Sequence, residues 1–335
     1  MMLKKILIFL VAVLILVAGV GILLPRNIRV ERSVDIERPA SLIYATVNSF
    51  QLFYKWSPWQ SLDPNMRQIT EGARDGVGAK LVWSGNDKVG SGTQLITAST
   101  PDRSVASDID FGKMGVAKST ILLDPQNSST KVTWTLDVDM GASPIGHYFG
   151  LMMDHMIGKD YERGLSKLKA LVESMPNVDI AGFVAEPVEL SAVPILVVSE
   201  TSPPDTASIS RAYTDGYAQL GKFMAKNKLH QSGAPLGIDG EMTSSAFSFQ
   251  VGMPIDRADV TPDGNVRVAQ SYAGKALKTT HVGPYDTLAK TYGAFRAYMA
   301  AHGYIASGTS FSRYVDGPAS TTPEKLRTEI YWPIQ

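Results

Sequence analysis

The sequence predicts an α+β protein with two domains behind a single N-terminal transmembrane helix. Three observations support this fold class: an apolar run near the N-terminus, a series of strand patterns closed by one long helical pattern, and a repeated strand-helix-strand-strand unit in the C-terminal half. The predicted boundaries are 1–27 for the anchor, 28–175 for the first domain, 176–187 for a linker and 188–335 for the second domain.

The charge and cysteine content exclude several classes of function. Thirty-two basic side chains balance 32 acidic ones, so the chain has no general electrostatic attraction to nucleic acid, and we expect no nucleic-acid partner. Cysteine is absent, which excludes disulfides, thiolate metal sites and cysteine nucleophiles.

Residues 6–24 form an unbroken apolar run of 19 residues, preceded by Lys4 and Lys5 and ended by Pro25 and Arg26. At a rise of about 1.5 Å per residue this run is long enough to cross a hydrocarbon core of about 30 Å. A cleaved signal peptide would have a shorter apolar region and a small-x-small cleavage site, which the run lacks. We therefore expect a single-pass anchor in the bilayer, with a cytoplasmic N-terminus and the domains on the extracytoplasmic side.

The first domain begins with an alternating strand at 28–35, and a helix opens after Pro39. Strand patterns follow at 67–71, 79–85, 90–99, 103–111, 116–124 and 130–140, separated by turn signals, and they predict one antiparallel sheet. Residues 144–173 then have a helical pattern that should cover the sheet. Four glycines in this helix, at 146, 150, 158 and 164, indicate either close approach to the sheet or space for a cavity.

The second domain contains the same unit twice. Its first copy has a strand at 193–200, a helix to about 227, and strands near 235–240, 245–255 and 265–271; the second has a strand at 275–282, a helix to about 302, and strands at 309–315 and 326–334. The two copies close alike, with FQVGMPI at 249–255 and TEIYWPI at 328–334, so that Gln250 corresponds to Glu329. Paired about a pseudo-twofold axis, the units should leave a groove at their junction.

The first domain resembles the SRPBCC superfamily in its polyketide cyclase/dehydrase branch. The resemblance covers residues 28–173 and rests on the WSPW sequence at 56–59, GVG at 76–78 and WSGN at 83–86. It implies a helix-grip (START-like) fold, in which a curved antiparallel sheet wraps a long C-terminal helix around an apolar cavity. It implies no single chemistry, because the superfamily includes lipid carriers as well as cyclases.

The second domain resembles the GyrI-like family, also called the AraC-type effector-binding domain. The matching residues are HVGPY at 281–285, HGY at 302–304 and TEIYWPI at 328–334. The resemblance implies a groove that binds organic, often cationic, amphiphiles between aromatic walls, with an acidic residue on the last strand facing the ligand. Glu329 is at that position. Some members are implicated in hydrolysis through a glutamate and a tyrosine in the groove, and others sense drugs for transcription regulators that carry a helix-turn-helix segment, which we do not find in this chain.

Glu329 is therefore the first candidate ligand contact, although strand alternation also permits it to face solvent while its neighbours face inward. The candidate set for the groove is Glu329, Tyr285, Tyr292, Tyr298, Tyr331, Trp332, Gln250 and Phe249. If the groove is catalytic, Tyr298 is the tyrosine to test first as a proton donor beside Glu329.

In the first domain, bulky side chains are candidates for the wall of a helix-grip cavity, with plain core packing as the alternative for each. They are Trp56, Trp59, Trp83, Phe111, Trp134, Met152 and Met156. His147 and His155 lie eight residues apart on the long helix, but no further ligand cluster completes a set, so we expect neither a metal nor a cofactor.

These patterns together favour a membrane-anchored, noncatalytic binding protein for small apolar or cationic amphiphilic molecules, held in the GyrI-like groove and also, in one interpretation, in the helix-grip cavity. The alternatives are a detoxifying hydrolase that acts on small electrophiles in the groove, and a noncatalytic interaction module. Ligand turnover separates the first two functions, and failure of both domains to bind an apolar probe would favour the third.

Overall fold

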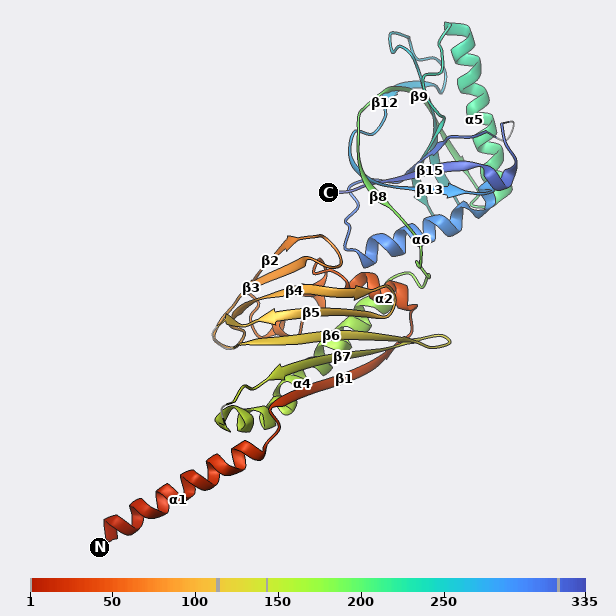
Figure 1. The fold of residues 1–335 in the computed structure, drawn as a ribbon. Helices are drawn as coiled ribbons and strands as arrows, with labels where there is room; N and C mark the ends of the chain where they lie inside the picture. Colours follow the sequence, from red (N-terminus) through yellow and green to blue (C-terminus); the bar gives the residue numbers. More distant parts are fainter. Residues whose placement is uncertain (1, 113–114, 143, 318–319) are drawn as a thin grey trace. The chain divides into compact units, whose positions relative to one another are not determined.

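The computed structural model describes residues 2–112, 115–142, 144–317 and 320–335. The chain divides into two compact units, one running to Ala181 and including the segment Ala297–Gly303, the other comprising Gly182–Arg296 and Tyr304–Gln335 (Figure 1). The predicted α+β fold class is confirmed: an apolar helix is followed by an antiparallel sheet with one long helix, and then by a second sheet domain. Helix α1 (Met2–Leu23) is long and apolar enough to cross a membrane.

The first unit has a seven-stranded antiparallel sheet. In chain order its elements are β1 (Asn27–Ile36), α2 (Ala40–Val47), α3 (Phe53–Trp56), a 3-10 turn (Trp59–Ser61), β2 (Arg67–Gly72), β3 (Ala79–Ser84), β4 (Ser91–Thr100), β5 (Ser104–Asp110), β6 (Val116–Pro125), β7 (Thr130–Asp139) and α4 (Pro144–Glu173). The strand order is β1-β7-β6-β5-β4-β3-β2. Each strand from β2 to β7 therefore pairs with the next strand in the sequence, and β1 is the edge strand beside β7.

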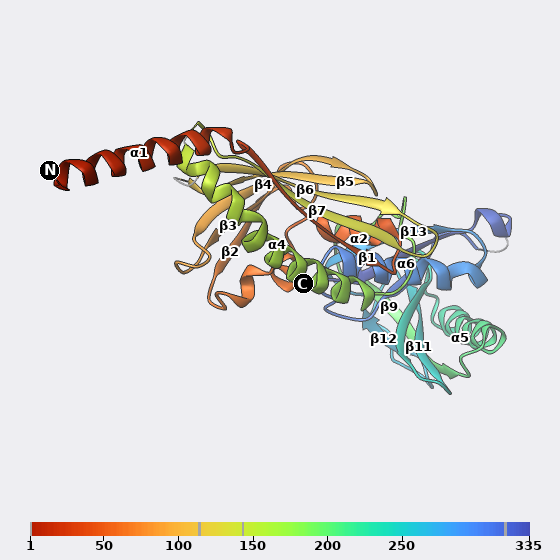
Figure 2. The same ribbon diagram turned by 90° about the horizontal axis from the view of Figure 1, so that it is seen from below.

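Helix α4 lies against this sheet, and its C-terminal half supplies much of the core (Figures 1 and 2). Tyr161, Leu165, Leu168 and Val172 are each no more than 2% exposed, and they recur at helical spacing on one side of α4. Strand β7 alternates buried and more exposed positions over most of its length, as expected for a strand with one face on the core.

The glycines of α4 allow the helix to approach the sheet closely. A Cβ atom at Gly150 would lie 2.7 Å from Cγ1 of Ile28, and one at Gly164 would lie 2.7 Å from Cζ3 of Trp134. At Gly158 a Cβ would meet the guanidinium of Arg32, and at Gly146 it would lie 2.9 Å from the carbonyl oxygen of Met140. Of the two explanations for these glycines, close approach is the one that the structure shows.

Substitution of Gly164 by alanine should therefore destabilise the first unit. The added methyl group would overpack against Trp134 and Pro58, which costs about 1–3 kcal/mol and outweighs the gain of about 1 kcal/mol in helix propensity. Gly221 is the matched control: it lies in a helix and has open space where a Cβ would project, so Gly221→Ala should stabilise its helix. Hydrogen exchange of peptides from each helix in the full chain measures both effects, and equal stabilisation by the two substitutions would contradict the packing argument.

The second unit has an eight-stranded sheet and two long helices. Its elements are β8 (Glu186–Leu190), β9 (Pro194–Ser202), α5 (Thr206–Asn227), β10 (Leu236–Met242), β11 (Phe247–Pro254), β12 (Arg267–Gln270), β13 (Gly274–Val282), a 3-10 turn (Tyr285–Thr287), α6 (Leu288–Ala301), β14 (Phe311–Tyr314), a 3-10 turn (Pro323–Lys325) and β15 (Arg327–Pro333). The last residues of α6, from Ala297, group with the first unit. The strand order is β12-β9-β11-β10-β14-β15-β13-β8, and the sheet curls strongly (Figure 1). The central pair β10-β14 joins the two β-α-β-β units.

One strand lies where the sequence predicts a linker. Strand β8 begins at Glu186 and pairs with β13 from Lys278 to Gly274, so the second sheet starts inside the predicted linker 176–187. Its sequence EPVEL is short, carries two acids and contains a proline, which is typical of an edge strand and gives little hydrophobic signal.

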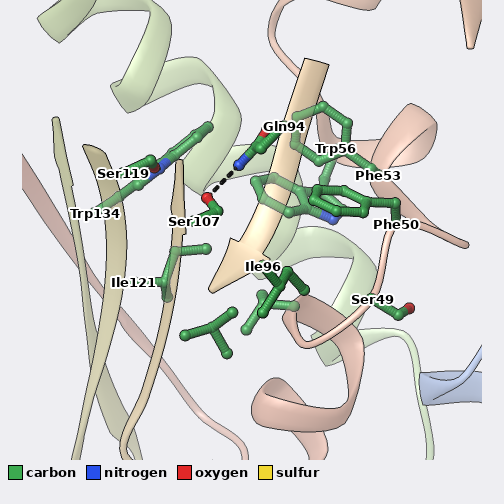
Figure 3. A pocket seen from close by; sticks show the side chains of 12 residues that line it. Ser49, Phe50, Phe53, Trp56, Gln94, Ile96, Ser107, Ser119, Ile121 and Trp134 are labelled. Carbon is green, nitrogen blue, oxygen red and sulfur yellow. Dashed lines mark hydrogen bonds between the residues drawn. The ribbon is translucent and has the colours of Figure 1, made fainter. Parts of the chain in front are cut away.

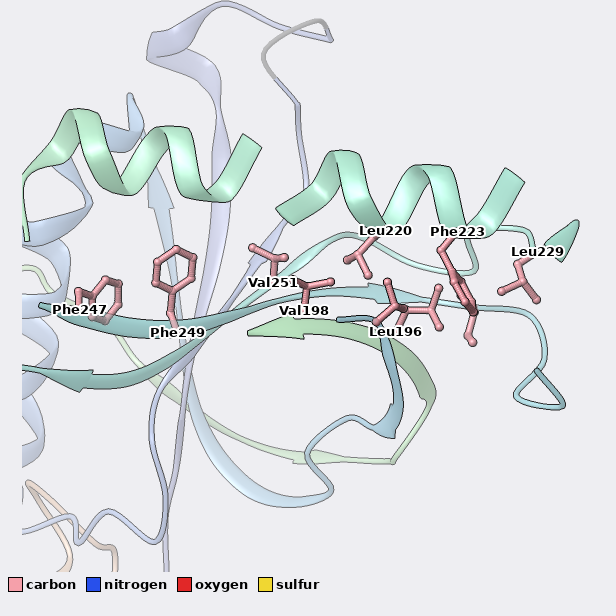
Figure 4. Close-up of a cluster of buried hydrophobic side chains, with 10 residues drawn as sticks. Leu196, Val198, Leu220, Phe223, Leu229, Phe247, Phe249 and Val251 are labelled. Atoms are coloured by element: carbon pink, nitrogen blue, oxygen red, sulfur yellow. The ribbon is translucent and has the colours of Figure 1, made fainter. Parts of the chain in front are cut away.

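Both long helices of the second unit pack on one face of its sheet, which we call the helix face. Helix α5 buries Leu220 and Phe223 against β9 and β11, in a cluster that contains Leu196, Val198 and Val251 (Figure 4). Helix α6 places Phe295 edge-on to Trp332 of β15, with ring centroids 5.7 Å apart.

Candidate functional site

The strand register of the second unit shows which candidate side chains share a face. Directly opposite residues of an antiparallel pair lie on the same face, and the register pairs Phe249 with Asp239, Gly237 with Ser312, and Ser312 with Ile330. Since Phe249 belongs to the core under α5, all of these residues lie on the helix face, as does Trp332, two residues after Ile330.

Glu329 lies on the opposite face of the sheet, together with Tyr331. Its carboxylate accepts a hydrogen bond of 2.7 Å from the hydroxyl of Tyr331, and its oxygens are 3.9 Å from Nη1 of Arg313 and 3.9 Å from Nζ of Lys278. The guanidinium of Arg313 lies 5.1 Å from the centre of the Tyr331 ring, and Phe311 stacks on the same ring at 4.9 Å. Two cations of the protein thus lie near the negative charge of Glu329, and one of them, Lys278, also pairs with Glu186 at 2.8 Å.

The structure does not bring the predicted groove residues into one site. Gln250 shares the face of Glu329 and donates to the hydroxyl of Ser199, whereas Phe249, Tyr285, Tyr292 and Trp332 belong to the helix face. Tyr298 belongs to α6, where its ring packs at 4.1 Å on that of His302. Tyr298 falls in the segment Ala297–Gly303, which groups with the first unit, whereas Glu329 belongs to the second unit.

The helix face holds a concentration of tyrosines that the sequence prediction only partly identified. We call it the tyrosine box, and its members are Tyr213 and Tyr217 from α5, Tyr285 from the 3-10 turn before α6, Tyr292 from α6 and Tyr314 from β14. The rings of Tyr213 and Tyr314 meet edge-on at 6.1 Å, and those of Tyr285 and Tyr314 at 5.4 Å. All five residues are half-buried, so each retains some surface that is accessible from outside.

Asp239 of β10 is the acid of the tyrosine box. Its carboxylate accepts a hydrogen bond of 2.7 Å from the hydroxyl of Ser310, and the hydroxyl of Tyr292, which bonds to Ser312 at 2.8 Å, also lowers its pKa. Burial raises the pKa of Asp239 above its ordinary value, and these hydrogen bonds and the nearby charge of Arg296 only partly oppose that shift. Burial likewise raises the pKa of Tyr292 and Tyr314, so the phenols around the acid are neutral donors.

A glycine makes room for the centre of the box. A Cβ atom at Gly237 would lie 2.6 Å from the hydroxyl oxygen of Tyr213 and 2.9 Å from that of Tyr314, so the two phenols meet directly above this residue. The side chain of Tyr217 is fixed to strand β10, because its hydroxyl donates a hydrogen bond of 2.8 Å to the carbonyl of Leu236. The sequence from 236 to 240, LGIDG, thus supplies both the acid and the space beside it.

Asp239 and Gly237 carry a signal in the sequence that the prediction did not use. An aspartate in the middle of a strand pattern disfavours a strand, and flanking glycines disfavour it further, so LGIDG conflicts with its own secondary structure. Such local conflicts are expected at functional sites.

In the first unit, the tryptophan candidates form an aromatic cluster beside a small cavity. The ring of Trp134 stacks on Tyr161 at 3.8 Å, and Trp56 and Trp59 approach it edge-on at 5.3 and 6.0 Å. The cavity is lined by Val47, Ser49, Phe50, Phe53, Trp56, Gln94, Ile96, Val105, Ser107, Ser119, Ile121 and Trp134 (Figure 3). The cavity has room for about one water molecule.

Two groups of predicted cavity residues lie elsewhere. Trp83 and Phe111 form a separate half-buried pair with centroids 5.9 Å apart. Met152 and Met156 are 58% and 52% exposed on α4, because the N-terminal half of this helix presents its apolar side away from the sheet. Among the residues that the structure describes, no cluster of three His, Asp or Glu side chains is arranged to hold a metal ion.

A half-buried acid beside aromatic rings on a tandem β-α-β-β sheet is an arrangement typical of small-molecule binding domains. Residues 186–335 match the GyrI-like small molecule binding domain family, and residues 27–173 match the polyketide cyclase / dehydrase and lipid transport family. The chain therefore carries a polyketide cyclase-like domain followed by a GyrI-like domain, as the sequence resemblance predicted.

Several solved structures are similar to part of this chain. The C-terminal domain of EcmrR is 19% identical with a TM-score of 0.41, over 45% of this chain and 97% of that one. A hydrolase from Listeria innocua is 15% identical with a TM-score of 0.33, over 45% and 91%. An EcmrR–DNA complex is 16% identical with a TM-score of 0.41, over 57% and 72%. No curated protein sequence shows significant similarity to the chain.

Proposed function

We propose that the protein is a membrane-anchored, noncatalytic binding protein for small cationic amphiphiles, and that the tyrosine box with Asp239 holds the ligand. Helix α1 is the anchor in this proposal, with the two domains on the extracytoplasmic side. The balanced charge of the chain gives no general attraction to nucleic acid, so the proposal includes no such partner.

The observation that carries the proposal is the half-buried carboxylate of Asp239 beside Tyr213, Tyr292 and Tyr314 of the tyrosine box. An organic cation there would interact with ring faces and with the carboxylate in a site of low dielectric constant, and both interactions are stronger than in water. No Arg or Lys forms a salt bridge with Asp239 among the described residues, in contrast to Glu329, which has Arg313 and Lys278 within 4 Å. Asp239 is therefore the acid whose charge a ligand would neutralise.

The anchor gives the binding site access to its ligands. Amphiphiles partition into lipid, so a domain held at the bilayer meets them at a higher effective concentration than a domain in bulk solution. The 22-residue helix α1 exposes its apolar side chains along its length, as a lipid-facing helix does.

Binding of thioflavin T, a cationic aromatic dye, to the full chain in lipid nanodiscs tests the proposal. We expect Asp239→Asn to weaken binding of this dye by about tenfold or more, equivalent to about 1.4 kcal/mol. Binding of the uncharged analogue that lacks the ring N-methyl group should change far less, because it does not depend on the carboxylate.

Glu329→Gln is the matched control, since it removes the acid of the opposite face. Empty nanodiscs correct for dye that dissolves in lipid. Equal affinity of the wild type and Asp239→Asn for the cationic dye would remove Asp239 from the site, and selective loss in Glu329→Gln would move the site to the opposite face. Appearance of a dye-derived product would instead favour the hydrolase alternative.

A further inference from the structure

The first turns of helix α4 have an apolar side that is left uncovered by the described part of the chain. Ile145, Phe149, Met152 and Met156 are between 52% and 79% exposed, and their spacing of four, three and four residues puts them on one side of the helix. Leu151 beside them is 56% exposed. The sequence from 144 to 153, PIGHYFGLMM, contains no Asp, Glu, Lys or Arg.

This part of α4 lies beside the end of the apolar helix α1. The carbonyl of Gly21 is 2.7 Å from Nδ1 of His147, and the carbonyl of Val17 accepts a hydrogen bond of 2.8 Å from the hydroxyl of Tyr148. A Cβ atom at Gly21 would lie 2.7 Å from Cβ of Pro144, so a glycine in α1 permits the close approach. Figures 1 and 2 both show the start of α4 next to the end of α1.

These contacts set the depth of α4 relative to the membrane span. Val17 is seven residues before Leu24, the last residue of the apolar run, which corresponds to about 10 Å along a helix. An interfacial helix buries its apolar face about 5–10 Å into the boundary between headgroups and acyl chains. A tyrosine that bonds to Val17 therefore lies at the depth of that boundary when α1 spans the bilayer.

We propose that residues 144–156 of α4 are a membrane-embedded segment whose apolar side, formed by Ile145, Phe149, Met152 and Met156, contacts lipid acyl chains. The proposal rests on the membrane anchorage proposed for α1. The first charged residue of the segment fits this orientation, since the carboxylate of Asp154 is paired with Arg32 of β1 at 2.9 Å. The segment holds the first domain against the bilayer surface. A domain joined to the membrane by α1 and a loop alone would be free to move away from that surface.

Site-directed spin labelling can test this directly, because the chain has no cysteine. Single variants Phe149→Cys and Met152→Cys would carry a nitroxide in the full chain, reconstituted in vesicles of palmitoyl-oleoyl-phosphatidylcholine. A label at Leu14→Cys in α1 is the reference for a position inside the bilayer. A label at Ser166→Cys, at an exposed position in the C-terminal half of α4, is the reference for a position in water. We expect labels at 149 and 152 to be accessible to oxygen and protected from a water-soluble nickel chelate, as at position 14.

Accessibility to the nickel chelate at 149 and 152 equal to that at 166, with position 14 protected, would overturn the embedded segment while leaving the anchor intact. Exposure of position 14 as well would overturn the anchor and the segment together. Circular dichroism of each labelled variant confirms that α4 is still folded.

Discussion

Replacement of Trp134 by alanine is expected to destabilise the first domain by about 3–5 kcal/mol, the cost of removing a buried aromatic ring. Trp134 is 2% exposed, stacks on Tyr161 at 3.8 Å and donates its indole N–H to the hydroxyl of Ser119 at 2.8 Å. A domain in the middle of the ordinary stability range, about 10 kcal/mol, would remain folded after this loss. Hydrogen exchange of β7 and α4 peptides in the full chain measures the change.

The same substitution should convert the small cavity of the first domain into a binding site. The wild-type cavity has room for about one water, and loss of the neighbouring indole adds the volume of the ring to a space lined mainly by apolar and aromatic side chains, which can bind a small aromatic molecule. Added indole should therefore restore part of the stability of Trp134→Ala.

The control for Trp134→Ala is Trp83→Ala. Trp83 is half-buried, pairs with Phe111 and is not among the residues that line the cavity, so its loss should have a smaller effect that indole does not reverse. A response to indole in both variants, or in neither, would show that the cavity does not depend on Trp134.

The architecture could be predicted from the sequence because its signals are local. Alternation and turn residues predict the strands from β2 to β7 within one or two residues, and helical periodicity locates α4 from residue 144 to 173. Edge strand β8 could not be predicted in this way, because it is stabilised by pairing with β13 and not by a hydrophobic pattern of its own.

The site was harder to predict because it depends on which face each strand presents. The sequence could not show whether Glu329 faces the helices, and the structure places it on the opposite face, paired with Arg313 and Lys278. It could not show that Asp239 and Tyr292, 53 positions apart, meet between α6 and the central strands. It also could not separate the buried half of α4, which ends in Val172, from the exposed half that carries Met152, since both have the same apolar period.

Asp239→Asn is expected to stabilise the second domain at neutral pH, in opposition to its effect on ligand binding. Burial raises the folded-state pKa of Asp239, so the folded protein holds this proton more tightly than the unfolded chain does. Ionised Asp239 therefore destabilises the fold above its raised pKa, and this unfavourable contribution disappears as the pH falls below the ordinary aspartate pKa of about 3.9. The asparagine variant should be more stable than the wild type at pH 7 and equally stable in acid, as measured by hydrogen exchange of β10 and α5 peptides.

Affinity for a cation should fall as the pH falls, whereas the stability of the second domain should rise. The wild type should lose affinity for thioflavin T as the pH falls through the raised pKa of Asp239, because the protonated carboxyl no longer attracts the dye, whereas Asp239→Asn should bind weakly at every pH. An acid that weakens the fold and strengthens binding is typical of a ligand site, since a bound cation would contact the carboxylate directly, whereas Arg296 acts on it without forming a salt bridge. Lower stability of Asp239→Asn at pH 7 would show instead that the hydrogen bond from Ser310 makes Asp239 a structural residue.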